Sequence, residues 1–363
     1  MPVDLPVRNS LSAVRNRAVR IAEMVATPLL PADYVDLIDP LASTAELRGR
    51  IVSVLPETRD SATLVIEPGT GWNRHVPGQY VRVGVDIRGV RQWRAYSITS
   101  SPDRRDGRIS ITVKAIEDGL VSNFLVHEVT AGTIVQLDRA CGDFTLGEMP
   151  RERVLFLTAG SGITPVMGML RSSAAQLEDV VVIHSAPTEK DVIFRRELRE
   201  LAEQSSIELI EIHTDVAGML NPVNLETMVP DLAERGIWAC GPAGMLDSLE
   251  EHLDSKGLLH RLHTERFRPT VIVTGDGGEV TFTETAITID ADGATPILDV
   301  GEGAGVLMPS GCRMGICFGC VVTLREGAVR DLRTGELTIA EPGDDLTIQT
   351  CINAVAGTCD IDL

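Results

Sequence analysis

The hydrophobic pattern of the chain changes twice, and each change marks a predicted domain. Over residues 46–150, short runs rich in Val and Ile alternate with polar turns, which is typical of β-strands with one buried face. Because these strands follow one another without crossover helices, we expect a closed antiparallel barrel. The predicted strands are Arg48–Leu55, Ala62–Ile66, Gln79–Val85, Gln92–Thr99, Arg108–Ala115 and Ile134–Leu137, and one helix is predicted near Val121–Glu128.

Over residues 151–262 the pattern changes to buried strands that alternate with helices. This order predicts a parallel sheet with helices on both faces. The predicted strands are Val154–Thr158, Val180–His184, Ile207–His213 and Ile237–Ala239, and the predicted helices are Pro165–Ser173, Arg195–Glu203 and Ala243–Lys256. Residues 263–269 are interpreted as a linker.

Residues 270–363 are predicted to form a third domain of the α+β class. Strands are expected at Val271–Val273 or Glu279–Phe282 and at Ala286–Ile289, followed by a helix near Ile297–Gly305 and then by a cysteine-rich loop. The whole chain is therefore expected to be a multidomain protein.

Residues 1–45 are predicted to form a helical extension ahead of the barrel. Arg8–Met24 has helical character, the proline-containing segment Thr27–Pro31 ends it, and a second short helix is predicted at Ala32–Leu37. We interpret the extension as an arm that packs over another domain. Docking to a partner or to a membrane surface is the alternative.

The composition excludes several classes of protein. A length of 363 residues with 44% hydrophobic residues is enough for two or three folded domains. No apolar run reaches the roughly eighteen residues that span a membrane, and the N-terminus lacks the apolar segment of a signal peptide, so we expect a cytoplasmic protein. A net charge of −19 argues against a nucleic-acid partner, because nucleic acids select basic surfaces.

The negative charge is concentrated in the last quarter of the chain. From Val271 to Leu363 there are fifteen Asp and Glu residues against four Arg and no Lys, a net charge of −11. Such a surface favours a basic partner and speeds its encounter at low salt. Solubility alone is the alternative explanation.

The most specific motif is a set of four cysteines near the C-terminus. Their spacing is C-x4-C-x2-C, followed by thirty residues and a fourth cysteine, which is the ligand spacing of a plant-type [2Fe–2S] site. Interleaved glycines allow the loop to wrap the cluster and to turn its N–H groups toward sulfur. Ordinary buried thiols and a zinc site are the alternatives, but zinc sites usually have two C-x2-C pairs. The predicted ligands are Cys312, Cys317, Cys320 and Cys351.

The predicted barrel carries a second motif, Arg94–Thr99, at the end of a strand. Arg94 is suited to a phosphate, and Tyr96 projects to the same face of the strand and can lie against a flavin ring. Ser97 offers a hydroxyl near the flavin N5. The later segment Gly119–Ser122 opens a helix, whose free N–H groups attract an anion such as the flavin phosphate.

Two glycine turns in the α/β segment predict a nucleotide site. Gly160–Pro165 reads G-x-G-x-x-P between a strand and a helix, and its glycines allow the backbone to approach a pyrophosphate closely. Cys240–Met245 again links a strand end to a helix. Such a pair of turns is suited to holding a nicotinamide close to a flavin.

Together these motifs resemble the ferredoxin–NADP reductase superfamily. The trailing cysteine motif resembles its oxygenase-reductase branch, with the domain order of phthalate dioxygenase reductase. The resemblance covers Glu46–Leu363 and implies a flavin-binding barrel over 46–150, an NAD(P)-binding domain over 151–262 and a β-grasp ferredoxin domain over 270–363. The segment Ala26–Pro31 resembles actinobacterial reductases that serve membrane acyl-CoA desaturases.

The resemblance implies an NAD(P)H-dependent oxidoreductase that passes electrons through FAD and the [2Fe–2S] cluster to an oxygenase, hydroxylase or acyl desaturase. A membrane-bound acceptor, with this protein at the membrane periphery, is one form of that expectation. Ser97, Thr164 and Cys240 are expected beside the reacting atoms. The expected cofactor-binding residues are Arg94, Ala95, Tyr96, Ser97, Thr99, Val113, Lys114, Gly119, Val121, Ser122, Gly160, Ser161, Gly162, Thr164, Pro165, Gly241, Pro242, Gly244 and Met245.

Three alternatives stay open at this point. FAD is favoured over FMN because the helix start at Gly119–Ser122 suits a diphosphate. NADH is favoured over NADPH because Asp215 stands where NADP-specific members carry Ser-Arg, although the likeness to desaturase reductases favours NADPH. An electron carrier with a vestigial nucleotide site, reduced by another reductase, is the alternative to an enzyme.

Overall fold

The computed structural model describes residues 39–42, 46–117, 119–147, 153–174, 176–267, 274–316 and 318–363. The extension predicted over residues 1–45 lies outside these residues except for 39–42, where Pro40–Ala42 forms one 3₁₀ turn. Within the described part of the chain, no helix is both long and apolar enough to cross a membrane.

The first domain is the predicted antiparallel barrel. Its strands hydrogen-bond in the order β4-β3-β6-β1-β2-β5, and a bridge between Ile98 and Ile111 joins the end of β4 to β5. Alternate Val, Ile and Leu side chains of these strands fill the interior. The strands are β1 (Arg48–Thr58), β2 (Ser61–Pro68), β3 (Tyr80–Ile87), β4 (Val90–Ser97), β5 (Ile109–Lys114) and β6 (Ile134–Leu137).

The helix predicted at Val121–Glu128 has two parts. An α-helical turn, α3 (Leu120–Asn123), continues into a π-helical segment, Phe124–Glu128, that ends with the Val129 N–H bonded to the Phe124 carbonyl. Val121, Leu125 and Val129 of this segment lie together in the barrel core.

The second domain is the predicted parallel sheet, with strand order β11-β10-β7-β8-β9. Helices α4 and α5 pack on one face, and α7 and α8 pack on the other. The strands are β7 (Val154–Ala159), β8 (Val180–Ala186), β9 (Ile207–His213), β10 (Gly236–Cys240) and β11 (Leu262–Glu265). The helices are α4 (Ile163–Ser173), α5 (Arg195–Gln204), α6 (Thr214–Ala217), α7 (Leu225–Met228) and α8 (Ala243–Ser255).

The structure differs from the sequence expectation at the start of the predicted linker. Residues 263–265 are not a connector but belong to β11. This strand pairs in parallel with β10, from Leu262 opposite Ile237 to Glu265 opposite Cys240. The physical reason is the α8 crossover, which returns the chain to the edge of the sheet, where β10 offers unpaired backbone groups.

The third domain is a mixed sheet with one helix, as the β-grasp expectation requires. Its order is β13-β12-β17-β14-β15, with β16 also paired to β14, and β12 runs parallel to β17. Helix α9 (Ile297–Gly303) ends two residues before the predicted end, and Val271–Val273 lie outside the described residues. The strands are β12 (Gly278–Phe282), β13 (Ile287–Ala291), β14 (Val321–Asp331), β15 (Leu337–Ala340), β16 (Leu346–Gln349) and β17 (Asn353–Ile361).

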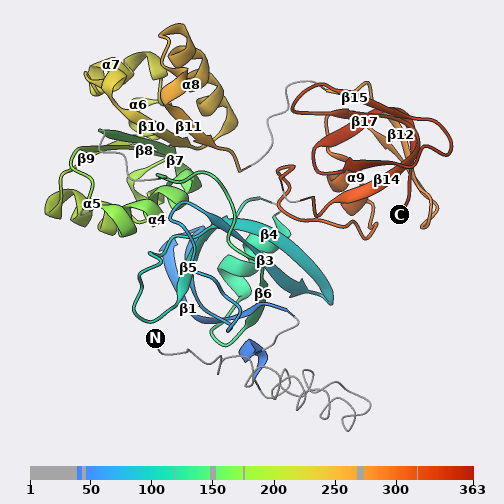
Figure 1. The fold of residues 1–363 in the computed structure, drawn as a ribbon, viewed down its shortest axis with the longest axis horizontal. Helices are drawn as coiled ribbons and strands as arrows, with labels where there is room; N and C mark the ends of the chain where they lie inside the picture. Colours follow the sequence, from blue (N-terminus) through green and yellow to red (C-terminus); the bar gives the residue numbers. More distant parts are fainter. Residues whose placement is uncertain are drawn as a thin grey trace, which may run out of the picture.

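The α/β domain and the ferredoxin-like domain both adjoin the barrel (Figure 1). The α/β domain approaches through α4, where a Cβ on Gly168 would lie 2.4 Å from the carbonyl oxygen of Ile98 just beyond β4. The ferredoxin-like domain approaches through Arg313, Glu302 and Asp299, whose charges act on Arg94 of β4. Strand β4 and the residues that follow it therefore adjoin both neighbouring domains.

Candidate flavin, nucleotide and cluster sites

The predicted flavin strand presents three polar side chains at the end of β4. Arg94 is half-buried and donates from Nη1 to the Trp93 carbonyl at 2.8 Å, and burial lowers its pKa, with nearby Arg313 acting in the same direction. Burial raises the pKa of the Tyr96 phenol, so the ring is neutral. Ser97 is 4% exposed, and its Oγ has no hydrogen-bond partner among the described residues.

The orphaned Ser97 hydroxyl fits a flavin. A buried hydroxyl without a partner costs about 1–3 kcal/mol, and a bound ligand at a functional site is one arrangement that completes its hydrogen bonding. A flavin ring edge supplies nitrogen and oxygen atoms that can do so. The chemistry of the residues present is therefore that of a flavin site: a cation, an aromatic ring and an unpaired hydroxyl on one strand end.

Three other residues expected at the cofactor have side chains that are engaged inside the barrel. The Thr99 hydroxyl hydrogen-bonds to Ser110 Oγ at 2.8 Å, Val113 is 1% exposed in the core, and Lys114 Nζ lies 2.9 Å from an Asp60 oxygen. Their assignment stays a prediction from the resemblance.

The segment Gly119–Ser122 forms a tight turn into α3. The Ser122 hydroxyl accepts from the Ile116 N–H at 3.3 Å and donates to the Gly119 carbonyl at 3.2 Å, and a Cβ on Gly119 would lie 2.4 Å from that hydroxyl. Val121 is buried in the barrel. The first N–H groups of a helix have no partner within it, so this start is suited to the phosphates of FAD.

The two glycine turns of the nucleotide domain touch each other. A Cβ on Gly162 would lie only 2.0 Å from the Cys240 carbonyl oxygen, so only glycine fits there. Gly160 has a φ of +54°, a conformation that favours glycine, and the Thr164 hydroxyl donates to the Ser161 carbonyl at 2.9 Å. Pro165 lies in the first turn of α4 and is buried.

The second turn is also tightly packed at its first glycine. A Cβ on Gly241 would lie 2.5 Å from the Met245 methyl group, whereas Gly244 faces open space and Pro242 caps α8. The structure thus brings the two predicted loops together at the carboxyl ends of β7 and β10, the edge where ligands bind in parallel sheets.

Cys240 is fully buried, and burial raises the pKa of its thiol well above the usual range, with Glu265 adding to the effect. The side chain is therefore an uncharged thiol inside the sheet.

Glu265 is a residue that the sequence interpretation missed. It stands opposite Cys240 in the β10–β11 register, its Oε2 is enclosed without a hydrogen-bond partner in the described structure, and burial raises its pKa to about 8. Interpreting residues 263–269 as a linker leaves this carboxyl out of the predicted site. Only recognition of 262–265 as a strand would have placed this carboxyl beside the nucleotide turn.

Glu265 gives a pH prediction. Its pKa is raised from 4.5 to about 8, so between those values the folded protein holds a proton that the unfolded chain releases, and stability falls as the pH rises. The slope is at most about 1.4 kcal/mol per pH unit. Glu265→Gln keeps the neutral shape, so its thermal midpoint should exceed that of the wild type by a margin that grows from about pH 5 to about pH 8. Parallel pH profiles of the two proteins would contradict the buried, protonated state.

The predicted cluster ligands converge, as far as the structure describes them. Cys320 Sγ and Cys351 Sγ lie 3.1 Å apart, and both thiols, like that of Cys312, are buried. The pKa of Cys351 is raised, first by its contact with Cys320 and then by burial. Cys317 lies outside the described residues, and no three His, Cys, Asp or Glu side chains in the described ranges gather tightly enough to hold one metal ion.

The cluster loop supplies backbone donors as well as thiols. The Met314 N–H points to Cys312 Sγ at 3.3 Å, and the N–H of Gly315 hydrogen-bonds to Cys351. Arg313 and Phe318 have positive φ, which is costly for residues with a side chain, and Gly315 has a φ of +74°, which glycine adopts readily. N–H groups aimed at sulfur are what stabilises thiolates bound to iron, so the described residues fit a [2Fe–2S] cluster.

Comparison with known families finds a domain for each of the three predicted cofactors. The chain matches the oxidoreductase FAD-binding domain over residues 66–146, the oxidoreductase NAD-binding domain over 156–251 and the 2Fe-2S iron-sulfur cluster binding domain over 280–355. It is 47% identical over 351 residues to the NADPH oxidoreductase of Mycobacterium tuberculosis, covering 95% of this chain and 91% of that protein.

The chain belongs to the ferredoxin–NADP reductase superfamily. Within it, the chain has the oxygenase-reductase arrangement, with the [2Fe–2S] domain at the C-terminus. It is 30% identical to the glycine betaine monooxygenase reductase subunit of Pseudomonas aeruginosa, over 83% of this chain and 91% of that one. Phthalate dioxygenase reductase has the same fold, with a TM-score of 0.59 at 21% identity over 87% of this chain and 97% of that structure.

The protein is thus an NAD(P)H-dependent iron–sulfur flavoprotein oxidoreductase. A flavin held at the β4 end would supply acceptance of a hydride and one-electron release, and a [2Fe–2S] cluster held by the cysteines would supply one-electron transfer. The part left to the protein in such chemistry is to hold and orient these groups, and no side chain needs to act as a nucleophile.

Proposed function

We propose that this reductase supplies electrons to a separate oxygenase, hydroxylase or acyl desaturase. The observation that carries the proposal is the position of the ferredoxin-like domain. Beyond the effect of burial, the charges of Arg313, in its cysteine loop, and of Glu302, in α9, shift the pKa of Arg94 in β4. A cluster loop beside the flavin strand is suited to taking electrons from the flavin and passing them outward. The reductase subunits among the relatives support the same direction of flow.

The charge of the cluster domain supports a protein acceptor with a basic docking face. Its four arginines are engaged internally: Arg313 with Asp299 and Glu302, Arg325 with Asp362, Arg333 with Asp331, and Arg330 with the Gly335 carbonyl. The remaining acidic side chains leave a negative surface, which favours a basic partner. An acceptor in a membrane stays a prediction from the resemblance of residues 26–31, which lie outside the described residues.

NADPH is the donor that we propose, in place of the NADH preference drawn from Asp215. Asp215 lies in α6, and its backbone N–H donates to the Pro187 carbonyl at 3.1 Å. The residue is exposed, so water and salt screen the repulsion between this carboxylate and a 2′-phosphate. The name of the relative with 47% identity supports NADPH. Near the reacting atoms we propose Ser97 and Thr164 as polar contacts and Cys240 as an uncharged packing residue.

Anaerobic titration tests the proposal. Addition of NADPH should bleach the flavin absorption first and the cluster absorption afterwards, and the reduced protein should then lose its electrons to a purified oxygenase or desaturase. NADH should do the same with a lower kcat/KM. If neither nucleotide reduces the flavin while dithionite does, the chain is a carrier with a vestigial nucleotide site and the proposed enzyme is wrong.

A further inference from the structure

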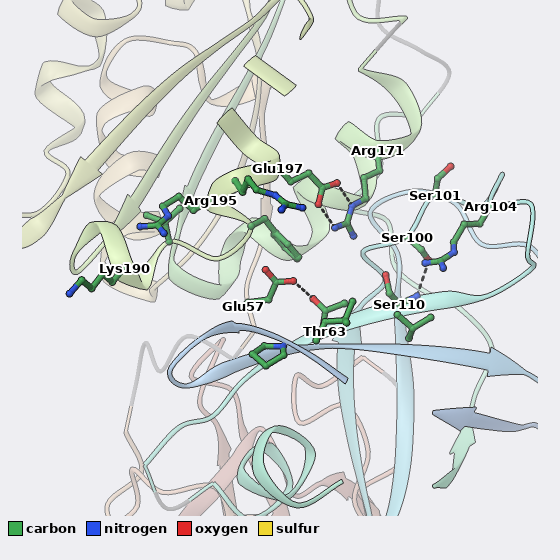
Figure 2. Close-up of a pocket in the computed structure, with 16 residues that line it drawn as sticks. Glu57, Thr63, Ser100, Ser101, Arg104, Ser110, Arg171, Lys190, Arg195 and Glu197 are labelled. Atoms are coloured by element: carbon green, nitrogen blue, oxygen red, sulfur yellow. Dashed lines mark hydrogen bonds and ion pairs between the residues drawn. The ribbon is translucent and has the colours of Figure 1, made fainter. Parts of the chain in front are cut away.

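A cavity of about 730 Å³ lies between the barrel and the first turn of α5. Its walls come from β1, β2 and the loop after β4 on one side and from α4 and α5 on the other. Figure 2 shows the Arg171 and Glu197 side chains facing each other on one wall and the Glu57–Thr63 pair on the opposite wall. The groups that border this gap therefore contribute to how the nucleotide domain sits against the flavin barrel.

Two side chains reach across this boundary: Arg59 of the barrel, which lies 3.9 Å from an Asp191 oxygen, and Arg171, which makes the closer contact. Arg171 lies on α4, the helix that begins at the Gly160–Pro165 nucleotide turn, and its Nη1 donates to the Thr99 carbonyl at 2.7 Å. Thr99 is the last residue of the Arg94–Thr99 motif. One hydrogen bond thus joins the helix that carries the nucleotide turn to the strand end that carries the predicted flavin contacts.

The rest of the Arg171 guanidinium is held from a third element. Its Nε and Nη2 donate to the two carboxylate oxygens of Glu197 on α5 at 2.7 and 2.6 Å, and its centre lies 4.9 Å from the Phe194 ring. A bidentate arginine pair with an aromatic contact has a fixed geometry, unlike the loose pair that a lysine makes. Arg171 is therefore held in one orientation across the domain boundary.

A second contact runs alongside it. The Phe194 N–H hydrogen-bonds to Glu57 of the barrel, which also accepts from the Thr63 hydroxyl at 2.6 Å. Phe194 has a φ of +61°, a costly backbone conformation for a residue with a side chain. Tertiary contacts maintain this strain at the same boundary that Arg171 bridges.

We infer that Arg171 is a positioning residue for hydride transfer. It sets the separation between the nucleotide turn and the flavin strand through α4, which already touches the barrel at Gly168 and Ile98. Hydride transfer is steep in donor–acceptor distance, and a shift of about 1 Å made far from the chemistry can cost about a hundredfold in rate. The inference rests on the proposed transfer from nucleotide to flavin.

The test is anaerobic stopped-flow reduction of FAD-loaded protein by NADPH. Arg171→Met keeps the length of the side chain but removes the bridge, so the limiting rate of flavin reduction should fall about ten- to hundredfold. Glu197→Gln weakens the bidentate hold and should cause a smaller fall in the same step. The dissociation constants of FAD and of NADP⁺, together with the flavin-to-cluster rate, should stay within about twofold, because these variants leave the cofactor contacts in place.

Arg104→Met is the matched control. Arg104 lines the same cavity and makes a bidentate pair with Asp106 at 2.8 Å, but both residues belong to the barrel. The control should reduce flavin at the wild-type rate. With 4-deuterated NADPH, the slowed Arg171→Met variant should show a full primary isotope effect on flavin reduction, because hydride transfer itself is impaired.

Three results separate the possibilities. A lower thermal midpoint with an unchanged reduction rate would show that Arg171 is only structural and would overturn the inference. If Arg171→Met does not fold, an unchanged rate in Glu197→Gln overturns it equally. If the wild-type protein is not reduced by either nucleotide, the proposed function fails, which is a different result from a loss confined to the Arg171 and Glu197 variants.

Discussion

Replacement of Cys351 by serine is expected to abolish the cluster while FAD binding and NADPH-driven reduction of a small dye persist. Cys351 Sγ lies 3.1 Å from Cys320 Sγ. Thirty residues separate the two cysteines in the sequence, and Cys351 is the fourth ligand that the spacing predicts. Loss of a direct ligand should exceed the roughly 10–100-fold loss of affinity or activity caused by removing an outer-shell partner. The measurement is the cluster absorption and the EPR signal of the reduced protein, alongside dye reduction.

Cys359→Ser is the matched control for this prediction. Cys359 lies eight residues later in the same domain, is 1% exposed, and has a pKa that burial raises to about 12, so it is an equally buried thiol without a place in the ligand spacing. The control should keep the cluster signal. Retention of an unchanged cluster in Cys351→Ser, or its loss in both variants, would show that the ligand set is wrong. Cys317→Ser should behave like Cys351→Ser, since the spacing alone predicts it.

Replacement of Ser97 by alanine should not destabilise the apoprotein but should slow flavin reduction in the FAD-loaded protein. The Ser97 hydroxyl is buried and has no partner within the described ranges, so its removal should leave the apoprotein equally stable or stabilise it by about 1–3 kcal/mol. Flavin reduction by NADPH should slow by roughly 10²-fold or more, the typical cost of losing one preorganised polar contact to a reacting centre.

The two halves of the Ser97 prediction need separate measurements. Thermal midpoints of apoprotein and FAD-loaded protein give the stability effect, and stopped-flow reduction gives the kinetic one. Ser97→Thr restores the hydroxyl and serves as the conservative variant. A variant that destabilises the apoprotein and reduces flavin at the wild-type rate would show that the hydroxyl is a structural group and does not face the flavin.

Much of this architecture is readable from local sequence because it depends on short-range rules. Period-two alternation gave the six barrel strands, and the strand–helix order gave the parallel sheet. Gly162 could be assigned to a tight turn from its neighbours, and the structure explains the requirement, since any Cβ there would meet the Cys240 carbonyl oxygen at 2.0 Å. These features depend on residues that are close in the chain or on the chemistry of one residue type.

Glu265 shows where such reasoning stops. A four-residue segment with one charged end carries too little periodicity to be recognised as a strand, and its pairing depends on where α8 returns the chain. Only that pairing encloses the carboxyl beside Cys240 and raises its pKa to about 8. Burial is a property of the assembled domain, so no local pattern predicts it.

The sequence by itself determined the chemistry of this protein, namely the cysteine spacing, the flavin motif and the two glycine turns, because each is a short arrangement of residue types with one ligand class. The tertiary structure decided the geometry between them. It brought Cys351 to Cys320, left the Ser97 hydroxyl unpaired and placed Arg171 between Thr99 and Glu197. These relations join residues that are distant in the chain, so they arise only when packing brings the domains and strands into contact.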